Sequence, residues 1–245
     1  MPRYFIHLAF NGGGFHGWQI QPEAPTVQSA LDGALAVLLR TPVETVGCGR
    51  TDTGVHASSF YAHFDSDGSI DTTWLCTKLN ALLPKSIAVF KVFEVDASLH
   101  ARFSATQRTY TYWLHTRKDP FLEHLSVETH YTLDLALMNQ AGEFLRTVND
   151  FGAFCKVGSD NKTTLCRLDE CHWEAAEHRI KLTISADRFL RNMVRSVVGT
   201  SIDLGRGKIT LVEFKAIVAS GNRSEAGTSA PAHGLYLSDV AYPFS

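Results

Sequence analysis

The spacing of apolar residues predicts alternating strands and helices along the chain. Residues 4–10 are rich in aromatic and aliphatic side chains, which is typical of a strand, and the Asn-Gly-Gly-Gly run after them predicts a turn. Apolar positions then recur at helical spacing from Val27 to Leu38, with Thr26 as the expected N-cap. The same reasoning predicts strands at 4–10, 44–49, 59–64, 87–95, 106–115, 165–173, 179–185 and 235–242, and helices at 26–38, 73–83, 135–145, 189–204 and 210–220.

These elements predict two α+β halves. One series of strands and helices occupies residues 1–104, and a second series of the same kind occupies residues 105–245. The last expected helix begins with a capping box, because Glu213 stands three residues after Thr210.

The composition indicates a globular chain and excludes disorder or a coiled coil. Hydrophobic residues make up 44% of the 245 residues. The chain has 23 basic and 25 acidic residues, and this net charge of −2 does not indicate a nucleic-acid-binding protein. Five cysteines without a Cys-x-x-Cys pair fit a reducing compartment. No apolar run approaches the ~20 residues of a membrane span, and the first residues are too polar for a signal peptide. We therefore expect a cytoplasmic protein.

Residues 12–17, Gly-Gly-Gly-Phe-His-Gly, satisfy the dinucleotide-binding pattern G-x-G-x-x-G. Pro22 and Pro25 nevertheless separate Gly17 from the expected helix, so no helix N-terminus can receive a pyrophosphate there. A flexible turn near a cleft is the favoured interpretation. The eleven histidines show no metal-ligand spacing. We therefore expect neither a cofactor nor a metal ion.

The segment 47–57 carries the first candidate chemistry. A strand ends at glycine, and the chain turns through Arg50 and Asp52 before another glycine. Spacing alone leaves two roles open for Asp52, a catalytic carboxylate and an Asx-turn stabiliser. His56 is close enough in sequence to form a dyad with Asp52, but no nucleophile in a suitable context accompanies it, which favours a structural His56.

The stretch 188–208 is basic, with five basic residues against one acid. On the expected helix 189–204 and the residue before it, Arg188, Arg191 and Arg195 are three and four residues apart and share one side. Arg206 and Lys208 follow. The residues form either a solvated basic face or a stripe that faces phosphates.

Several segments, taken in chain order, resemble the tRNA pseudouridine synthases of the TruA type. They run from the N-terminal part to the C-terminal part of the chain: Phe15-x-Gly17-Trp18-Gln19-x-Gln21, Thr26-Val27-Gln28, Gly49-Arg50-Thr51-Asp52-x-Gly54-Val55-His56-Ala57, Leu79-Asn80-x-x-Leu83-Pro84, residues 100–105 with Arg108-x-Tyr110-x-Tyr112, Asp150-Phe151, Phe189-Leu190-x-x-Met193-Val194-Arg195 and residues 234–237. Thr53 and Asn149 depart from the family pattern, which usually has Ala and His there. Neither departure affects the expected catalytic carboxylate.

The resemblance implies an α+β pseudouridine synthase fold, in which two ferredoxin- or RRM-like halves with largely antiparallel sheets join around a central, positively charged cleft. It also implies a homodimer, no cofactor and no metal. The implied activity is that of an isomerase, which converts uridine to pseudouridine in the anticodon stem-loop of tRNA.

The resemblance also assigns roles to individual residues. Asp52 matches the catalytic carboxylate, as nucleophile or as base, and Arg195 matches its ion-pair partner. Tyr110 matches a tyrosine that stacks on the flipped base, and its neighbour Tyr112 is expected in the core. Leu235 matches an apolar residue of the pocket, and Arg50 is expected to contact phosphate or fill the space that the base leaves. The remaining expected phosphate contacts are Arg188, Arg191, Arg206 and Lys208.

Two other functions compete with this interpretation. A non-catalytic RNA-binding α+β module could bind RNA by stacking bases on aromatic side chains of its strands. A dinucleotide-dependent oxidoreductase would rest on residues 12–17 alone. An intact Asp52 and Arg195, each within its full motif, favour the synthase over both.

Overall fold

The computed structural model describes residues 1–159 and 162–243, and the chain folds into two compact units. Unit 1 contains residues 1–106 and the segment from Tyr236 onward, and unit 2 contains Gln107–Leu235. Unit 2 is therefore inserted between two parts of unit 1. The sequence suggests a division at residues 104 and 105 and assigns everything after it to the second half. In the structure the final strand belongs to unit 1, because it pairs with a strand of that unit.

Unit 1 is an α+β unit with a largely antiparallel sheet. Its elements are β1 (Arg3–Phe10), η1 (Gly12–Gly14), α1 (Val27–Leu39), β2 (Val46–Gly47), β3 (His56–Asp65), α2 (Thr72–Leu82), β4 (Ile87–Val95) and most of β9 (Leu235–Ala241). The strand order is β4-β1-β3-β9, with β2 also paired to β3, and only β3 and β9 run parallel. The first six strands and helices follow the ferredoxin-like β-α-β-β-α-β order. The expected fold class is confirmed.

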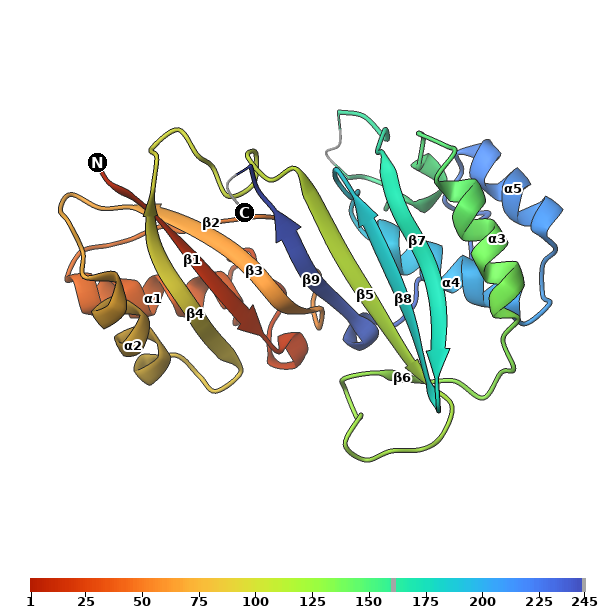
Figure 1. Ribbon diagram of the computed structural model, residues 1–245, viewed down its shortest axis with the longest axis horizontal. Coiled ribbons are helices and arrows are strands. Elements are labelled where there is room, and N and C mark those ends of the chain that lie inside the picture. Colours follow the sequence, from red (N-terminus) through yellow and green to blue (C-terminus); the bar gives the residue numbers. More distant parts are fainter. Residues whose placement is uncertain (160–161, 244–245) are drawn as a thin grey trace. The chain divides into compact units, whose positions relative to one another are not determined.

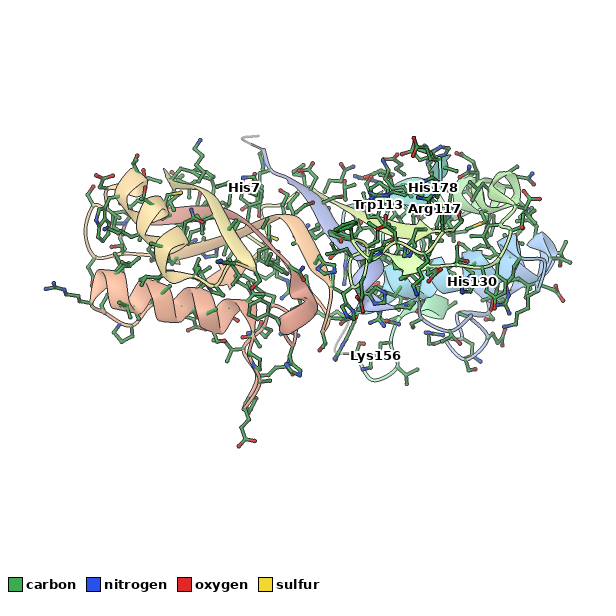
Figure 2. The ribbon with its side chains drawn as sticks, turned by 90° about the horizontal axis from the view of Figure 1, so that it is seen from below. His7, Trp113, Arg117, His130, Lys156 and His178 are labelled. Atoms are coloured by element: carbon green, nitrogen blue, oxygen red, sulfur yellow. The ribbon has the colours of Figure 1, made fainter. Side chains whose placement is uncertain are left out.

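The core of unit 1 lies between its sheet and its two helices. Successive residues of a strand point to opposite faces. Tyr4, Ile6 and Leu8 of β1 are buried on the face that α1 and α2 cover (Figure 1). On the other face, His7 stacks on Tyr61 with ring centroids 4.4 Å apart, and Figure 2 shows His7 on the side of the strands away from α1. The helices therefore cover one face of the sheet.

Unit 2 is built in the same way. Its elements are β5 (Gln107–His115), β6 (Val127–Glu128), α3 (Leu135–Leu145), η2 (Gly152–Phe154), β7 (Leu168–Ala176), β8 (Arg179–Ala186), α4 (Met193–Gly205), α5 (Leu211–Ser220) and η3 (Ala232–Gly234). The antiparallel order is β5-β8-β7, and β6 runs parallel to β5. Figure 1 shows α3, α4 and α5 gathered beside these strands. Trp113, labelled in Figure 2, lies beneath the Lys181 ammonium group, which is 5.8 Å from the ring centre.

Several predicted boundaries agree with the structure. The bounds of β4 and α3 match the expected ranges, and Thr210 forms the predicted capping box with Glu213 at the start of α5. The strand expected at 44–49 is reduced to Val46–Gly47. Within the two described ranges, no helix combines the length and the apolar character needed to cross a bilayer.

Candidate active site

Asp52 lies in the irregular loop that connects β2 to β3. The loop closes on itself, because the Val55 N–H donates to the Asp52 carbonyl oxygen over 3.1 Å. The Gly54 N–H donates to the Phe15 carbonyl oxygen over 3.3 Å, and Gly54 itself has a φ of +78° that favours glycine. Asp52 is partly exposed at the first position of this turn. The loop therefore presents the carboxylate while its backbone is tied to the segment around Phe15.

Gly12 and Gly17, the first and last glycines of residues 12–17, are explained by this loop. A Cβ atom on Gly12 would clash with the Val55 carbonyl, and one on Gly17 would clash with the Thr51 carbonyl. Gly17 also has a φ of +83°, which a side chain would strain. Both glycines are buried. Gly12 and Gly17 are thus packed against the Asp52 loop, whereas Gly13, Gly14 and His16 are exposed.

The same segment does not have the form of a dinucleotide site. After Gly17 the chain continues without regular secondary structure, and α1 begins only at Val27. The first N–H groups of α1 are not open to a pyrophosphate, because those of Val27 and Gln28 donate to the carbonyl oxygens of Gly17 and Trp18 over 3.2 and 3.1 Å. The close approach of two backbone segments explains the first and last glycines of the pattern, whereas a Cβ on Gly14 would have no atom within 4 Å.

His56 is buried at the start of β3. Its Nδ1 atom accepts a hydrogen bond from the Gly12 N–H over 3.0 Å, and its ring stacks on Tyr236, with centroids 4.6 Å apart. This buried and hydrogen-bonded position agrees with the structural role that the sequence favours for His56. Arg50, at the start of the same loop, is exposed to solvent.

In unit 2, Arg195 lies in the first turn of α4 and is held by the segment 228–231. Its Nε atom donates to the Ala230 carbonyl oxygen over 2.7 Å, and the Ala230 N–H donates to the Arg195 carbonyl oxygen over 2.9 Å. The segment runs close to the helix, because a Cβ on Gly199 would clash with the Thr228 carbonyl. These contacts fix the direction of the guanidinium group.

The prediction of a helix over 189–204 is wrong at its start. Asn192 adopts a left-handed conformation, with φ +65°, and α4 begins at Met193. Asparagine tolerates this conformation better than most residues, and its side chain donates to Ser196 (2.9 Å) and Ser229 (2.7 Å). Arg188 and Arg191 therefore precede the helix and do not form a helical stripe with Arg195.

The basic residues of the window 188–208 have different surroundings. Arg191 is exposed, and the structure gives it no acidic partner among the described residues. Arg206 and Lys208, at the other end of α4, both pair with Asp203, at 3.5 and 3.0 Å. Arg206 also lies over the Tyr131 ring, 4.6 Å from its centre. Of these three side chains, Arg191 is the one that has no acidic partner among the described residues.

Tyr110 and Leu235 belong to the same unit. Tyr110 is half-buried on β5 and meets the edge of Phe189, with centroids 5.1 Å apart. Tyr112 is fully buried, as expected, and its hydroxyl donates to the Pro231 carbonyl oxygen over 2.9 Å. Leu235 is buried at the start of β9, directly after Gly234, which packs against the Tyr112 ring. The segment 228–235 therefore connects the surroundings of Arg195 and Leu235.

Two residues of this arrangement were not singled out by the sequence. Ala230 acts through its backbone, for which its side chain gives no signal. Asn192 stands between two arginines in an apolar periodic stretch, and only its dihedral angles separate it from a helix interior.

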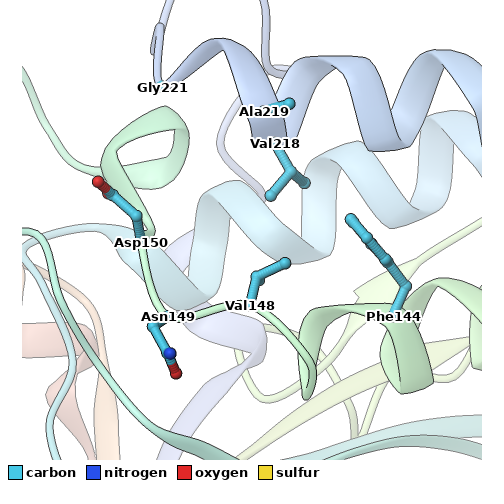
Figure 3. Close-up of a pocket in the computed structure, with 7 residues that line it drawn as sticks. All are labelled: Phe144, Val148, Asn149, Asp150, Val218, Ala219 and Gly221. Atoms are coloured by element: carbon cyan, nitrogen blue, oxygen red, sulfur yellow. The ribbon is translucent and has the colours of Figure 1, made fainter.

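A pocket of about 350 Å³ lies elsewhere in unit 2, between the ends of α3 and α5 (Figure 3). Phe144 and Val218 extend into it, whereas the Asp150 carboxylate accepts a hydrogen bond from the Gly152 N–H over 2.9 Å. Its lining has no basic side chain and includes none of the expected site residues. This pocket is therefore not the candidate active site. Among the described residues, no group of three His, Cys, Asp or Glu side chains is placed to hold a metal ion.

Comparison with known proteins identifies the family. A family model described as tRNA pseudouridine synthase matches residues 148–243. The chain is 49% identical to tRNA pseudouridine synthase A of Parabacteroides distasonis, over 99% of this chain and 97% of that protein. It is 38% identical to the Bacillus subtilis protein of the same name, over 96% and 97%. The chain belongs to the tRNA pseudouridine synthase A family.

Family membership covers both units. The match to the family model includes Arg195 and Leu235 but begins after Asp52 and Tyr110. These two residues lie in the N-terminal part of the chain, which the full-length relatives also span. The synthase A of Bacteroides fragilis, for example, is 47% identical over 98% of this chain and 96% of its own length. The resemblance drawn from the motifs is confirmed at the level of the family.

Proposed function

We propose that this chain converts uridine to pseudouridine in the anticodon stem-loop of tRNA and that Asp52 is its catalytic carboxylate. The observation that carries the proposal is the placement of Asp52. It is a partly exposed carboxylate in a loop whose backbone packs on Gly12 and Gly17. Full-length relatives named as tRNA pseudouridine synthases give the reaction and the substrate class.

The reaction explains why one carboxylate suffices. The bond between N1 of uracil and C1′ of the ribose breaks, the base turns, and a bond forms between C5 and C1′. The proton on C5 leaves and N1 gains one, so no atom is added and no electron acceptor is required. Asp52 can serve by attacking the base or the sugar, or by removing a sugar proton.

Arg195 is proposed as the ion-pair partner of Asp52. A carboxylate in a closed site needs a cation to compensate for lost hydration, and a guanidinium group can form two parallel hydrogen bonds with it. The clamp between Arg195 and Ala230 supports this role, because the hydrogen bond from Nε holds the guanidinium group in one orientation.

The remaining residues are proposed to hold the RNA. A uridine that leaves its stack loses a few kcal/mol, and an aromatic face returns ~1–3 kcal/mol per base, which suits the half-buried Tyr110. Leu235 would line the pocket, and Arg50 would contact a phosphate or fill the space of the flipped base. The proposed phosphate contacts are Arg188, Arg191, Arg206 and Lys208.

Release of tritium from tRNA labelled at C5 of uracil tests the proposal. The wild-type chain should release tritium with many turnovers, and Asp52→Asn, which keeps the shape of the side chain, should release none above background. Binding of tRNA without any release by the wild type would instead show the non-catalytic RNA-binding module. Equal release by both proteins would remove Asp52 from the mechanism.

We also propose that the protein is a cytoplasmic homodimer. A tRNA substrate and free cysteines are consistent with a reducing, intracellular site. Light scattering on the purified chain should give twice the mass of 27.1 kDa. A mass of one chain at micromolar concentration would contradict the dimer.

A further inference from the structure

The Asp52 loop has little regular structure of its own, so neighbouring groups must fix its conformation. β3 begins at His56, four residues after Asp52. Within the loop, the hydrogen bond from Val55 to Asp52 closes one turn, and the bond from Gly54 reaches the carbonyl of Phe15. Both are backbone contacts. A side chain that ties the loop to the rest of unit 1 would therefore have a strong influence on where the carboxylate lies.

His56 provides such a side chain. It is only 1% exposed, and its Nδ1 atom accepts the Gly12 N–H over 3.0 Å. An imidazole nitrogen that accepts a hydrogen bond carries no proton, so the ring proton of His56 is on Nε2. The ring stacks on Tyr236 of β9, at an interplanar angle of 26°, which sets its orientation.

We propose that His56 is a positioning residue for Asp52, because its Nδ1 atom holds the Gly12 turn against the loop that carries the carboxylate. This inference rests on the proposed catalytic role of Asp52. His56 itself touches no substrate in this proposal.

The contacts of the Gly12 turn show how the effect reaches Asp52. The Gly12 turn (η1, Gly12–Gly14) lies against the Val55 carbonyl, and Gly17, three residues after the turn, lies against the Thr51 carbonyl. The segment 12–17 therefore touches the loop on both sides of Asp52. When the acceptor on His56 is lost, the buried Gly12 N–H has to find another partner, and the turn moves with the loop. A displacement of about 1 Å can reduce a catalytic rate about 10²-fold.

Two substitutions of His56 separate its acceptor from its ring. His56→Asn places an oxygen near the position of Nδ1 and removes the ring. His56→Phe keeps a ring for Tyr236 and removes the acceptor. His63→Phe is the matched control, because His63 is 4% exposed and its Nδ1 accepts the Ala101 N–H over 3.1 Å, away from the Asp52 loop.

We expect kcat for tritium release to fall about 10- to 100-fold in His56→Phe, with KM for tRNA changed less than threefold. His56→Asn should recover most of kcat. His63→Phe should lower the melting temperature and leave kcat unchanged. A wild-type kcat in folded His56→Phe, or an equal loss in both His56 variants, would overturn the inference. An inactive wild-type enzyme would instead contradict the proposed function.

A second measurement needs no variant. Long-range ¹⁵N–¹H spectra of the wild-type protein distinguish the two neutral forms of an assigned histidine. His56 should show a proton on Nε2 and an unprotonated Nδ1 that accepts a hydrogen bond. A proton on Nδ1 would exclude the bond from Gly12 and with it the proposal, even if the His56 variants do not fold.

Discussion

Arg195 and Ala230 are joined by two hydrogen bonds that run in opposite directions, one from the guanidinium Nε and one from the Ala230 backbone N–H. The side chain of the arginine and its own backbone are therefore both held by a single residue 35 positions away. This arrangement limits the freedom of the long side chain before any substrate arrives. A pre-oriented guanidinium group loses less entropy when it pairs with a carboxylate.

Substitution of Arg195 should reduce catalysis far more than stability. In Arg195→Met we expect kcat to fall about 10²- to 10³-fold, because the proposed partner of Asp52 is lost. The melting temperature should fall by only a few degrees, since one hydrogen bond is worth about 1 kcal/mol. Arg195→Lys keeps the charge but not the planar group and should recover only part of the rate. Near-normal single-turnover rates in Arg195→Met would remove the proposed role.

Gly17 should tolerate no side chain. In Gly17→Ala, the new Cβ meets the Thr51 carbonyl at a backbone φ of +83°, so we expect a loss of about 2 kcal/mol or more in the free energy of unfolding. kcat should fall as well, because Thr51 precedes Asp52. Gly14→Ala is the control, since a Cβ there has no atom within 4 Å. Urea unfolding should show Gly14→Ala within about 0.5 kcal/mol of the wild type.

His63 should make unit 1 less stable in acid. Burial lowers the pKa of His63 to about 4, with Arg3 and His100 adding to the effect and Asp65 opposing it. Because the unfolded chain binds this proton more tightly, the free energy of unfolding should fall as the pH drops from about 6.5 towards 4. His63→Asn keeps an acceptor for Ala101 and does not titrate. Urea unfolding should find it close to the wild type at pH 7 and more stable by about 2 kcal/mol at pH 4.5.

Asp32 should have the opposite effect. Burial raises the pKa of Asp32 to about 6, although the Thr45 hydroxyl (2.6 Å) and backbone N–H (3.1 Å) both donate to it. The folded chain therefore binds this proton more tightly than the unfolded chain does. The stability that this proton adds to the free energy of unfolding is lost as the pH rises through 6. Asp32→Asn can accept both bonds without a charge. It should be more stable than the wild type by about 1 kcal/mol at pH 7.5, a value reduced for partial exposure, and equal to it near pH 4. Equal stabilities at both pH values would contradict this assignment.

The salt dependence of tRNA binding should distinguish the two ends of α4. Each phosphate contact contributes about 0.7–0.9 to the slope of log K against log salt concentration. Arg191→Ala should reduce that slope by about one contact. Arg206→Ala should reduce it by less than half as much, because Asp203 already neutralises Arg206. Equal reductions would show that the pair with Asp203 opens when RNA binds.

The periodicity of apolar residues predicts much of this fold, because local burial determines it. β4 and α3 have the bounds that their patterns indicate. The start of α4 could not be found in this way, since Phe189 and Leu190 continue the apolar pattern and only the backbone of Asn192 interrupts it. The place of β9 is also hidden, because its pairing with β3 joins residues 180 positions apart, as between His56 and Tyr236.

In the candidate site, too, local features could be predicted from the sequence and long-range backbone contacts could not. The types of side chain in the Asp52 loop and around Arg195 are visible in the sequence. Their supports are the backbone of Gly12 and of Ala230, and a residue letter says nothing about which distant group its backbone meets. The pairing of Arg206 with Asp203 was open to prediction, because the two are three residues apart at the C-terminal end of α4.

The parallel pairing of β3 with β9 gives unit 1 an unusual order of assembly. Tyr236 is synthesised 180 residues after His56, so a growing chain has all the residues of the Asp52 loop long before the ring that stacks on His56. The stacking contact that orients His56 can form only after β9 has been synthesised. Chains interrupted within unit 2 would carry Asp52 and still lack this contact.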